Sequence, residues 1–349
     1  MMPWEEWVEQ LRRDRTLLPD RLALLVETDD AELETLLANA ARSVARLHFG
    51  NGVYVRGLIE VSNYCRNGCY YCGIRSANRG LQRYRLNKVQ ILECCRIGYS
   101  LGFRTFVLQG GEDPLQTDDF VEEVVSAIHT IWPDCAITLS LGEKSRESYE
   151  RFFRAGASRY LLRHETYDSA HYRSLHPPGM SRDNRLRCLD DLKSIGYQTG
   201  TGIMVGSPGQ TVNHLVDDLL FIQRFRPQMI GIGPFLPHHA TPFAHEPAGN
   251  LRQTLRLLSI LRLMHPLALI PSTTALATLS PEGRTRGILA GANVVMPNLS
   301  PSSLRSNYAL YDDKACLGAE SAEGIAQLQS QLESIGYRID WGRGDFGDV

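Results

Sequence analysis

The sequence lacks three features that would assign it to large classes of proteins. It has no uninterrupted apolar run of the ~18 residues needed to span a bilayer, although 43% of its 349 residues are apolar. It has no excess of charge of one sign, since the formal net charge is −2. Residues 1–6 have neither the basic segment nor the apolar stretch of a secretory signal. We therefore expect a cytoplasmic protein that binds neither membrane nor nucleic acid.

The sequence also lacks the cysteines of a disulfide framework. It contains eight cysteines, and three of these lie within residues 65–72. Such sparse use in a long chain is typical of a reducing compartment. Low-complexity segments and repeats are absent as well. No apolar surface patch can be read from the sequence, so we expect a monomer.

Three of the cysteines are clustered directly after the apolar run 53–61. They form a C-x3-C-x2-C pattern: Cys65, Cys69 and Cys72. A structural zinc site needs four ligands, and the nearest histidine upstream is His48; reduced structural thiols are the other alternative. Four cysteines saturate an iron–sulfur cluster, so three leave one iron with an open position for a chelating ligand. The pattern therefore favours an iron–sulfur cluster that takes part in catalysis.

The hydrophobic pattern after residue 50 alternates between strands and helices. Eight short apolar runs predict strands, at residues 53–61, 105–109, 136–141, 159–163, 199–205, 229–233, 268–272 and 293–297. Amphipathic stretches between them predict helices, for example 117–131, 211–225 and 250–264. Alternating units of this size favour an α/β fold, a complete (βα)8 TIM barrel, over an open doubly wound sheet.

Three segments of the chain follow from this pattern. Residues 1–50 are predicted as an N-terminal helical segment with a cap region at Asp29-Asp30. Residues 51–310 form the barrel, and residues 311–349 form a C-terminal extension packed on it. The extension has one predicted helix, followed by a Gly- and Asp-rich end that we expect to fray.

Polar and glycine-rich segments follow nearly every predicted strand. They are residues 110–114, 140–143, 163–166, 206–210, 233–235, 272–274 and 296–298. TIM-barrel enzymes build their active sites at this end of the strands. Arg163 and Glu165 alternate with His164, so that both face the lumen while the histidine points outwards. Arg159 lies on the lumen side by the same alternation. Charges buried in this way favour a bound ligand.

The cysteines outside the cluster do not suggest a second site. Cys94, Cys95 and Cys188 lie in predicted helices. Cys135 lies at the start of a predicted strand, at the end remote from the polar rim. We expect all four to be buried as small apolar side chains.

The cysteine loop after the first strand, together with the Gly-Gly-Glu segment 110–112 after the second, resembles the radical S-adenosylmethionine (SAM) superfamily. The resemblance implies that Cys65, Cys69 and Cys72 ligate one [4Fe–4S] cluster. It also implies that SAM binds the open iron through its amino and carboxylate groups. An electron from the cluster would then cleave SAM into methionine and a 5′-deoxyadenosyl radical.

Within the superfamily, residues 45–340 resemble the family of [FeFe]-hydrogenase maturases. The shared phrases are residues 65–78, 108–114, 138–143, 159–166, 184–186, 208–211, 231–235 and 296–298. The residues thereby implied to bind SAM are Tyr71, Gly110, Gly111, Glu112, Glu165 and Arg185. Gly111 and Glu112 would hold its amino group, and Arg185 its carboxylate. Glu165 would contact its ribose and sulfonium side.

The same resemblance implies a substrate pocket inside the barrel. Its residues would be Thr138, Ser140, Arg159, Arg163, Met229, Thr273 and Thr274. Arg159 and Arg163 would grip an anion, either a carboxylate or cyanide on an iron complex. A closed barrel with few inward polar groups suits chemistry in which a radical must be kept from water.

The resemblance implies a radical SAM enzyme of anaerobes that helps to build the diiron site, the H-cluster, of [FeFe]-hydrogenase. The implied substrate is a small cysteine-bearing iron carbonyl/cyanide compound, attacked at sulfur by the adenosyl radical. Implied partners are a reductant such as ferredoxin or flavodoxin and other hydrogenase maturases. Some members carry an accessory cluster on three cysteines near the C-terminus. Only Cys316 is present here, so we expect a single cluster.

Two alternatives to this function are open. Methylornithine synthase, a lysine mutase of the same superfamily, shares parts of these phrases and would use Arg159 and Arg163 in the same way. An iron–sulfur carrier or scaffold would deliver iron without SAM chemistry, but it would not require Glu112, Glu165 and Arg185. A sulfur donor of the biotin synthase type is disfavoured, because no lumen cysteine could hold a sacrificial second cluster.

Overall fold

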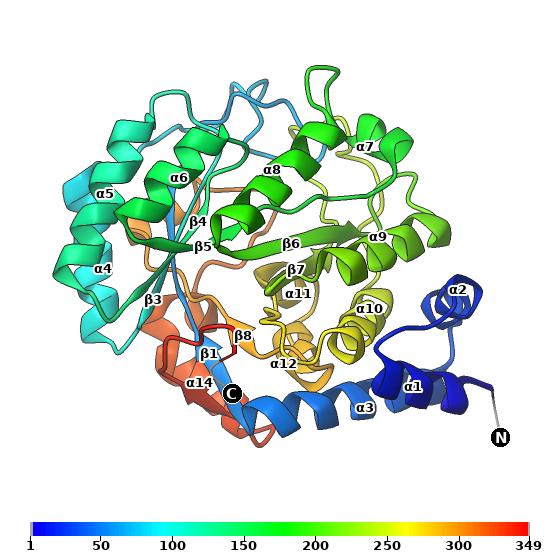
Figure 1. Ribbon diagram of the computed structural model, residues 1–349. Helices are drawn as coiled ribbons and strands as arrows, with labels where there is room; N and C mark the ends of the chain where they lie inside the picture. The colour runs from blue at the N-terminus through cyan, green and yellow to red at the C-terminus, as the bar shows by residue number, and fades with distance from the viewer. Residues whose placement is uncertain (1–2, 348–349) are drawn as a thin grey trace.

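The computed structural model describes residues 3–347 as parallel strands wrapped by helices (Figure 1). Three helices precede the strands: α1 (Pro3–Asp14), α2 (Pro19–Glu27) and α3 (Ala31–Phe49). The carboxylate of Asp30 accepts a hydrogen bond from Leu33 N at 2.9 Å and caps α3. The predicted cap region at the start of this helix is therefore confirmed.

The strands of the described residues form two parallel sheets. They are β1 (Gly52–Val55), β2 (Gly57–Ser62), β3 (Thr105–Gly110), β4 (Ala136–Ser140), β5 (Ala157–Leu161), β6 (Gln198–Val205), β7 (Met229–Pro234), β8 (Val294–Val295) and β9 (Arg338–Asp340). The larger sheet has the order β2-β3-β4-β5-β6-β7, and the smaller has the order β8-β1-β9. All pairings within both sheets are parallel. The predicted α/β fold with parallel strands is confirmed.

The predicted strand 53–61 is split at Arg56 into β1 and β2. β1 pairs with β8 and β9, whereas β2 pairs with β3. The backbone N of Arg56 donates to Val295 O at 3.0 Å, and that of Leu58 donates to Pro297 O at 2.9 Å. One continuous run of chain therefore connects the two sheets.

The predicted strand 268–272 does not form a regular strand. Leu269 makes an isolated parallel bridge to Met229, and Pro271 makes one to Val294. Pro271 has no N–H to donate to a ladder, which limits pairing here. This segment nevertheless lies between β7 and β8 and contacts both.

Helices cover the outer side of the larger sheet (Figure 1). The helices after β2 are α4 (Lys88–Ser100), α5 (Asp118–Ile131), α6 (Arg146–Ala155), α7 (Ser169–Leu175), α8 (Arg182–Ile195), α9 (Val212–Phe225), α10 (Leu251–Met264), α11 (Thr274–Leu279), α12 (Gly283–Leu289), α13 (Ser302–Arg305) and α14 (Ile325–Glu333), with the short 3-10 turns η1 (Gly318–Glu320) and η2 (Ala322–Gly324). Val121, Val124 and Ile128 of α5 are buried, as its amphipathic pattern predicts. None of the helices in residues 3–347 is long and apolar enough to cross a membrane.

The Gly- and Asp-rich segment is ordered as far as residue 347, which corrects the prediction that it frays. β9 pairs with β1 through Val53↔Ile339. Beyond it, Asp345 binds the buried Arg159 of β5 at 2.6 Å. A strand pairing and a buried ion pair hold the segment in place, although its composition is typical of a mobile tail. Residues 348 and 349 lie outside the described part.

Candidate active site

The cysteine loop begins directly after β2 and is bonded to segments that follow other elements of the larger sheet. Arg66 N donates to Glu112 O, and Tyr70 N donates to Leu175 O, both at 2.9 Å. The three cysteine thiols are free. The loop that carries them therefore lies over the C-terminal ends of the strands, where the sequence predicts the site.

One arginine that the sequence analysis missed organises this loop from within. The guanidinium of Arg83 donates to four backbone carbonyls, those of Asn63, Ile74, Arg75 and Asn78. Three of these bonds measure 2.8, 2.7 and 3.0 Å. Nothing in the local pattern distinguishes Arg83 from the neighbouring arginines, because its partners are backbone atoms brought together by the fold.

The environment of the three thiols fits a metal cluster. Burial raises the pKa of Cys65, Cys69 and Cys72. The neighbouring Cys65 thiol adds to this at Cys72, whose pKa rises to about 12. At Cys69, both of the other thiols raise the pKa further. Half-buried thiols with a raised pKa stay protonated at neutral pH unless a cation holds them as thiolates. No histidine or further cysteine joins them to complete a four-ligand zinc site in the described residues.

The segment after β3 approaches the cysteine loop very closely. A Cβ at Gly111 would lie 2.2 Å from Tyr64 O and 2.7 Å from Cys65 Cβ, so only glycine fits. The next residue, Glu112, is 8% exposed and accepts from Arg66 Nε at 3.0 Å. Its other oxygen accepts from Glu143 N at 2.9 Å. A carboxylate is thus held beside the first cysteine.

Glu165 occupies a strained backbone position after β5. Its φ is +67°, in the left-handed region that a side chain other than glycine adopts at a cost. Its carboxylate accepts from Arg163 Nη2 at 2.9 Å, and its backbone N donates to Gly202 O at 3.1 Å. Strain of this kind is typical of functional sites, and here it places a carboxylate at the rim.

Arg185 extends the rim from the first turns of α8. Its Nε donates to Glu143 Oε1 at 2.5 Å, and its Nη1 donates to Arg163 O at 2.6 Å. A cavity of about 570 Å³ opens beside Glu112 and Glu143, and Arg66 and Asn184 also line it. The fold therefore brings three predicted cofactor residues to one end of the sheet. Glu112 follows β3, Glu165 follows β5, and Arg185 lies in α8.

Three of the predicted substrate residues present polar atoms that have no hydrogen-bond partner among residues 3–347. The buried atoms are Thr138 Oγ1, Arg163 Nε and Thr273 Oγ1. A buried polar group without a partner costs about 1–3 kcal/mol, so these atoms are typical of a site that binds a polar ligand. Ser140 lies two residues after Thr138 at the end of β4. Thr274 is different, because its hydroxyl already donates to Glu320 at 2.8 Å.

Two predicted substrate residues make their contacts towards the opposite end of the strands. Arg159 binds Thr105 Oγ1 at 3.1 Å, and Thr105 is the first residue of β3. The anion that it binds is Asp345 of the same chain, whereas the resemblance implies an anion of the substrate. Met229 is the first residue of β7, and its sulfur accepts from Arg56 Nη1 at 3.2 Å. The structure therefore does not bring this pair together with the rim.

The outward direction of His164 and the burial of four further cysteines are confirmed. His164 is fully buried between Thr201, at 2.8 Å, and Asp218 of the outer helix α9, at 3.1 Å. Cys94, Cys95, Cys135 and Cys188 are all buried. None of these side chains belongs to the rim.

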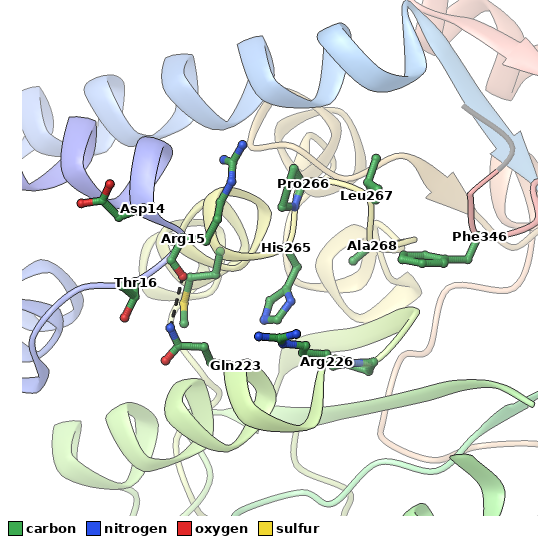
Figure 2. A pocket seen from close by; sticks show the side chains of 12 residues that line it. Asp14, Arg15, Thr16, Gln223, Arg226, His265, Pro266, Leu267, Ala268 and Phe346 are labelled. Atoms are coloured by element: carbon green, nitrogen blue, oxygen red, sulfur yellow. Dashed lines mark hydrogen bonds between the residues drawn. The ribbon is translucent and has the colours of Figure 1, made fainter. Parts of the chain in front are cut away.

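A separate cavity of about 440 Å³ lies between α1, α9 and the segment after α10 (Figure 2). It is lined by Arg15, Arg226 and His265 among others, and Gln223 Nε2 donates to Arg15 O at 3.3 Å. Burial lowers the pKa of His265 to about 4, so its ring is neutral at physiological pH. None of the predicted site residues lines this cavity, so the chemistry predicted from the sequence belongs to the other end.

The open thiol triad and the charged rim together define a class of enzyme. A sequence profile described as the Radical SAM superfamily matches residues 59–222, from β2 into α9. The chain belongs to the radical SAM superfamily. Membership implies a [4Fe–4S] cluster and SAM as cofactors, and the free thiols and the Gly111 cradle fit them.

Particular relatives match the chain over nearly its whole length. It is 42% identical over 343 residues to the [FeFe] hydrogenase maturase subunit HydE of Thermotoga maritima, covering 98% of this chain and 97% of that protein. It is 32% identical to the 3-methylornithine synthase of Methanosarcina barkeri, covering 92% of this chain and 90% of that protein. A crystal structure of methylornithine synthase (PylB) matches with a TM-score of 0.85 and 29% identity, over 95% of this chain and 97% of that one.

Proposed function

We propose that the protein is a radical SAM enzyme that helps to assemble the diiron active site, the H-cluster, of [FeFe]-hydrogenase. The observation that carries this proposal is the 42% identity to HydE over 98% of the chain. It is supported by the convergence of the cysteine loop with Glu112, Glu165 and Arg185 at one end of the sheet.

We assign the cofactors to this convergence. Cys65, Cys69 and Cys72 would hold the [4Fe–4S] cluster, which supplies the electron for reductive cleavage of SAM to a 5′-deoxyadenosyl radical. Six residues would bind SAM: Tyr71, Gly110, Gly111, Glu112, Glu165 and Arg185. Glu112 suits the cationic amino group, because its carboxylate is buried and already oriented by Arg66 and Glu143 N. The guanidinium of Arg185 suits a carboxylate.

We assign the substrate to the lumen beneath this rim. It would be a small sulfur-containing compound, a cysteine-bearing iron carbonyl/cyanide complex. Arg163 supplies a positive charge for an anionic group. Thr138 and Thr273 supply hydroxyls that can orient it, since neither has a partner in the described part of the chain. Ser140 and Thr274 lie beside them in sequence. Arg159 and Met229 would act at the far end of the lumen. For Arg159 to bind the substrate, an anionic group of the substrate would have to replace Asp345.

The fold suits radical chemistry if the barrel is closed. We propose a complete eight-stranded barrel over residues 51–310, flanked by the N-terminal helical segment 1–50 and the C-terminal extension 311–349. Isolated bridges at Leu269 and Pro271 support closure between β7 and β8, and the pairing of β1 with β8 supports it on the other side. A closed wall would keep water away from a reactive intermediate.

The proposed setting is the cytoplasm of an anaerobe. A ferredoxin or flavodoxin would supply the electron, and other hydrogenase maturases would be partners. We propose a monomer with a single cluster. Cys316 is the one cysteine of the C-terminal extension, and an accessory cluster would need more ligands than it offers.

One further candidate function has a specific observation in its favour. The match to methylornithine synthase, a TM-score of 0.85, makes a lysine mutase the alternative within the superfamily. The lumen of such an enzyme would have to hold an amino acid, so lysine should be turned over with SAM. Incubation with lysine as sole substrate, with product analysis by mass spectrometry, separates the two activities.

The mechanism is tested by anaerobic reconstitution with iron and sulfide, followed by SAM and dithionite. We expect 5′-deoxyadenosine from the wild type and none from Cys69→Ala. The carrier or scaffold alternative predicts a reducible cluster without cleavage of SAM, and that outcome would reject an enzymatic function.

A further inference from the structure

A short segment, residues 175–180, runs from the last residue of α7 towards α8 and covers the cysteine loop; we call it the cover. Its first residue, Leu175, accepts from Tyr70 N at 2.9 Å. Its last, Met180, places its sulfur 3.7 Å from Cys69 Sγ. The cover is itself a tight turn, since Met180 N donates to the carbonyl of Pro177 at 3.0 Å. The cysteine loop is therefore held on its outer side by a segment that contributes no predicted ligand.

A side-chain hydrogen bond also joins the cover to the cysteine loop. Nε2 of His176 lies 3.1 Å from the phenolic oxygen of Tyr71. The other ring nitrogen, Nδ1, lies 2.8 Å from the carbonyl oxygen of Tyr172, which can only accept. Nδ1 must therefore carry a proton. Burial lowers the pKa of His176 to about 3, so the ring is neutral and Nε2 is an acceptor. The hydroxyl of Tyr71 consequently donates to His176, and its lone pairs face away from the histidine.

The geometry of the two rings strengthens this contact. Tyr71 and His176 meet edge to face, with ring centroids 5.4 Å apart and planes at 89°. On its other side, His176 stacks on Tyr172 of α7 at 4.0 Å. The histidine is 1% exposed. Its ring is therefore held tightly between α7 and Tyr71, so the position of α7 determines the position of the tyrosine ring.

Tyr71 lies at the junction of the cysteine loop and the charged rim. It stands between the second and third cysteines in sequence, and its ring packs with the buried Leu175, Met204 and Phe235. After the cover, the chain enters α8 at Arg182 and reaches Arg185 one turn later. The cover thus connects the cysteine loop directly to the helix that carries the rim arginine.

We propose that His176 is a positioning residue for the radical SAM reaction: it holds Tyr71, and with it the cysteine loop, in register with the helix that presents Arg185. Among the described residues, the ring of His176 forms its hydrogen bonds to Tyr71 and to the carbonyl of Tyr172, and none to the thiols or the rim carboxylates. The inference rests on the proposed cofactor-binding roles of Tyr71 and Arg185, and it concerns how these two groups are aligned.

The test compares four variants with the wild type after anaerobic reconstitution. His176→Phe keeps a ring but removes the acceptor, His176→Gln restores an acceptor at similar reach, and Tyr71→Phe removes the donor. The fourth is the double variant His176→Phe/Tyr71→Phe. The matched control is His245→Phe, an exposed histidine outside the site. The readouts are iron per chain and the dissociation constant of SAM, followed by the change that SAM causes in the EPR spectrum of the reduced cluster.

We expect His176→Phe to load iron normally and to weaken SAM binding about three- to tenfold, the range for one lost hydrogen bond. His176→Gln should regain most of the affinity. In the Tyr71→Phe background, the His176→Phe change should add nothing. If His176→Phe does not load iron, the same comparison is made with His176→Gln, which must then match the wild type in iron content, SAM affinity and EPR response.

Two results would overturn the proposal. One is normal SAM affinity and an unchanged EPR response in His176→Phe. The other is a loss that is as large in the Tyr71→Phe background as in the wild type, which would mean that His176 acts through general packing. Failure of the proposed function itself looks different, because the wild type would then show no EPR response to SAM.

Discussion

The carboxylate of Asp345 lies 2.6 Å from Nη2 of Arg159, and this bond joins the last described turn of the chain to the middle of β5. Arg159 is fully buried. Gln198, the first residue of β6, donates to the same carboxylate oxygen at 2.8 Å. A buried guanidinium without a counter-charge is strongly destabilising. The chain therefore supplies that charge from its own C-terminal segment, at the end of the sheet remote from the cysteine loop.

Removal of this charge should destabilise the protein. We expect Asp345→Asn to lower the free energy of unfolding by about 3 kcal/mol, because it removes a carboxylate bound to the buried guanidinium of Arg159. Urea unfolding followed by circular dichroism measures the change. The control is Asp14→Asn, whose ion pair with Arg13 is exposed and should contribute nothing measurable. Equal midpoints for Asp345→Asn and the wild type would contradict the prediction.

The same pair should make stability depend on pH in the acid range. Burial alone would raise the pKa of Asp345, but Arg159 lowers it from 3.8 to about 2. The folded pKa is thus below the unfolded one, so the pair contributes fully above about pH 4 and is lost as the pH falls towards 2. Asp345→Asn should show a shallower loss of stability across this window than the wild type. If the free energy of unfolding fell with pH equally in the two proteins, the prediction would be wrong.

Arg83 should govern how firmly the cysteine loop retains iron. Arg83→Met removes four donors to backbone carbonyls. We expect iron to be lost to a chelator about tenfold faster, which corresponds to one charge-assisted hydrogen bond. Arg79→Met is the matched control, since Arg79 is exposed in the same loop. The prediction fails if both variants release iron at the rate of the wild type.

The backbone of Glu165 should lower the stability of the protein, while its carboxylate should contribute to SAM binding. Its left-handed backbone favours glycine, so Glu165→Gly should be more stable than Glu165→Gln by about 1 kcal/mol. Both variants should bind SAM more weakly than the wild type, because both lack the carboxylate. Thermal unfolding of the apoproteins and titration of the reconstituted proteins with SAM provide the two measurements. A glycine variant that is the less stable of the pair would show that the backbone here is not strained.

Cys316 should be dispensable for metal content. If the enzyme holds a single cluster, Cys316→Ser retains ~4 iron atoms per chain, as expected for one cubane. Cys69→Ala should lose most of its iron in the same preparation. Iron and sulfide analysis after reconstitution gives the answer. A wild type with clearly more iron than Cys316→Ser would reveal a second site.

Local patterns in the sequence were sufficient for several features of this protein. The spacing of Cys65, Cys69 and Cys72 depends only on one loop, so it could be interpreted without the fold. Alternation along the predicted strand 159–163, carried on to Glu165, correctly separated His164 from the lumen, because side-chain direction in extended chain has a period of two. The cap at Asp30 follows from adjacent residues in the same way. Each of these signals lies within a few residues of the feature that it predicts.

Other features depend on residues that meet only when the chain folds. The sequence alone determined the class of enzyme, the parallel α/β architecture and the thiol triad. Only the tertiary structure decided that Arg159 pairs with Asp345, that Arg83 binds the cysteine loop and that His176 meets Tyr71. Those partners are 186, 5 to 20 and 105 positions apart in the chain. Their contacts depend on how whole strands and helices are packed, and hydrophobic patterning does not specify which polar groups that packing brings together.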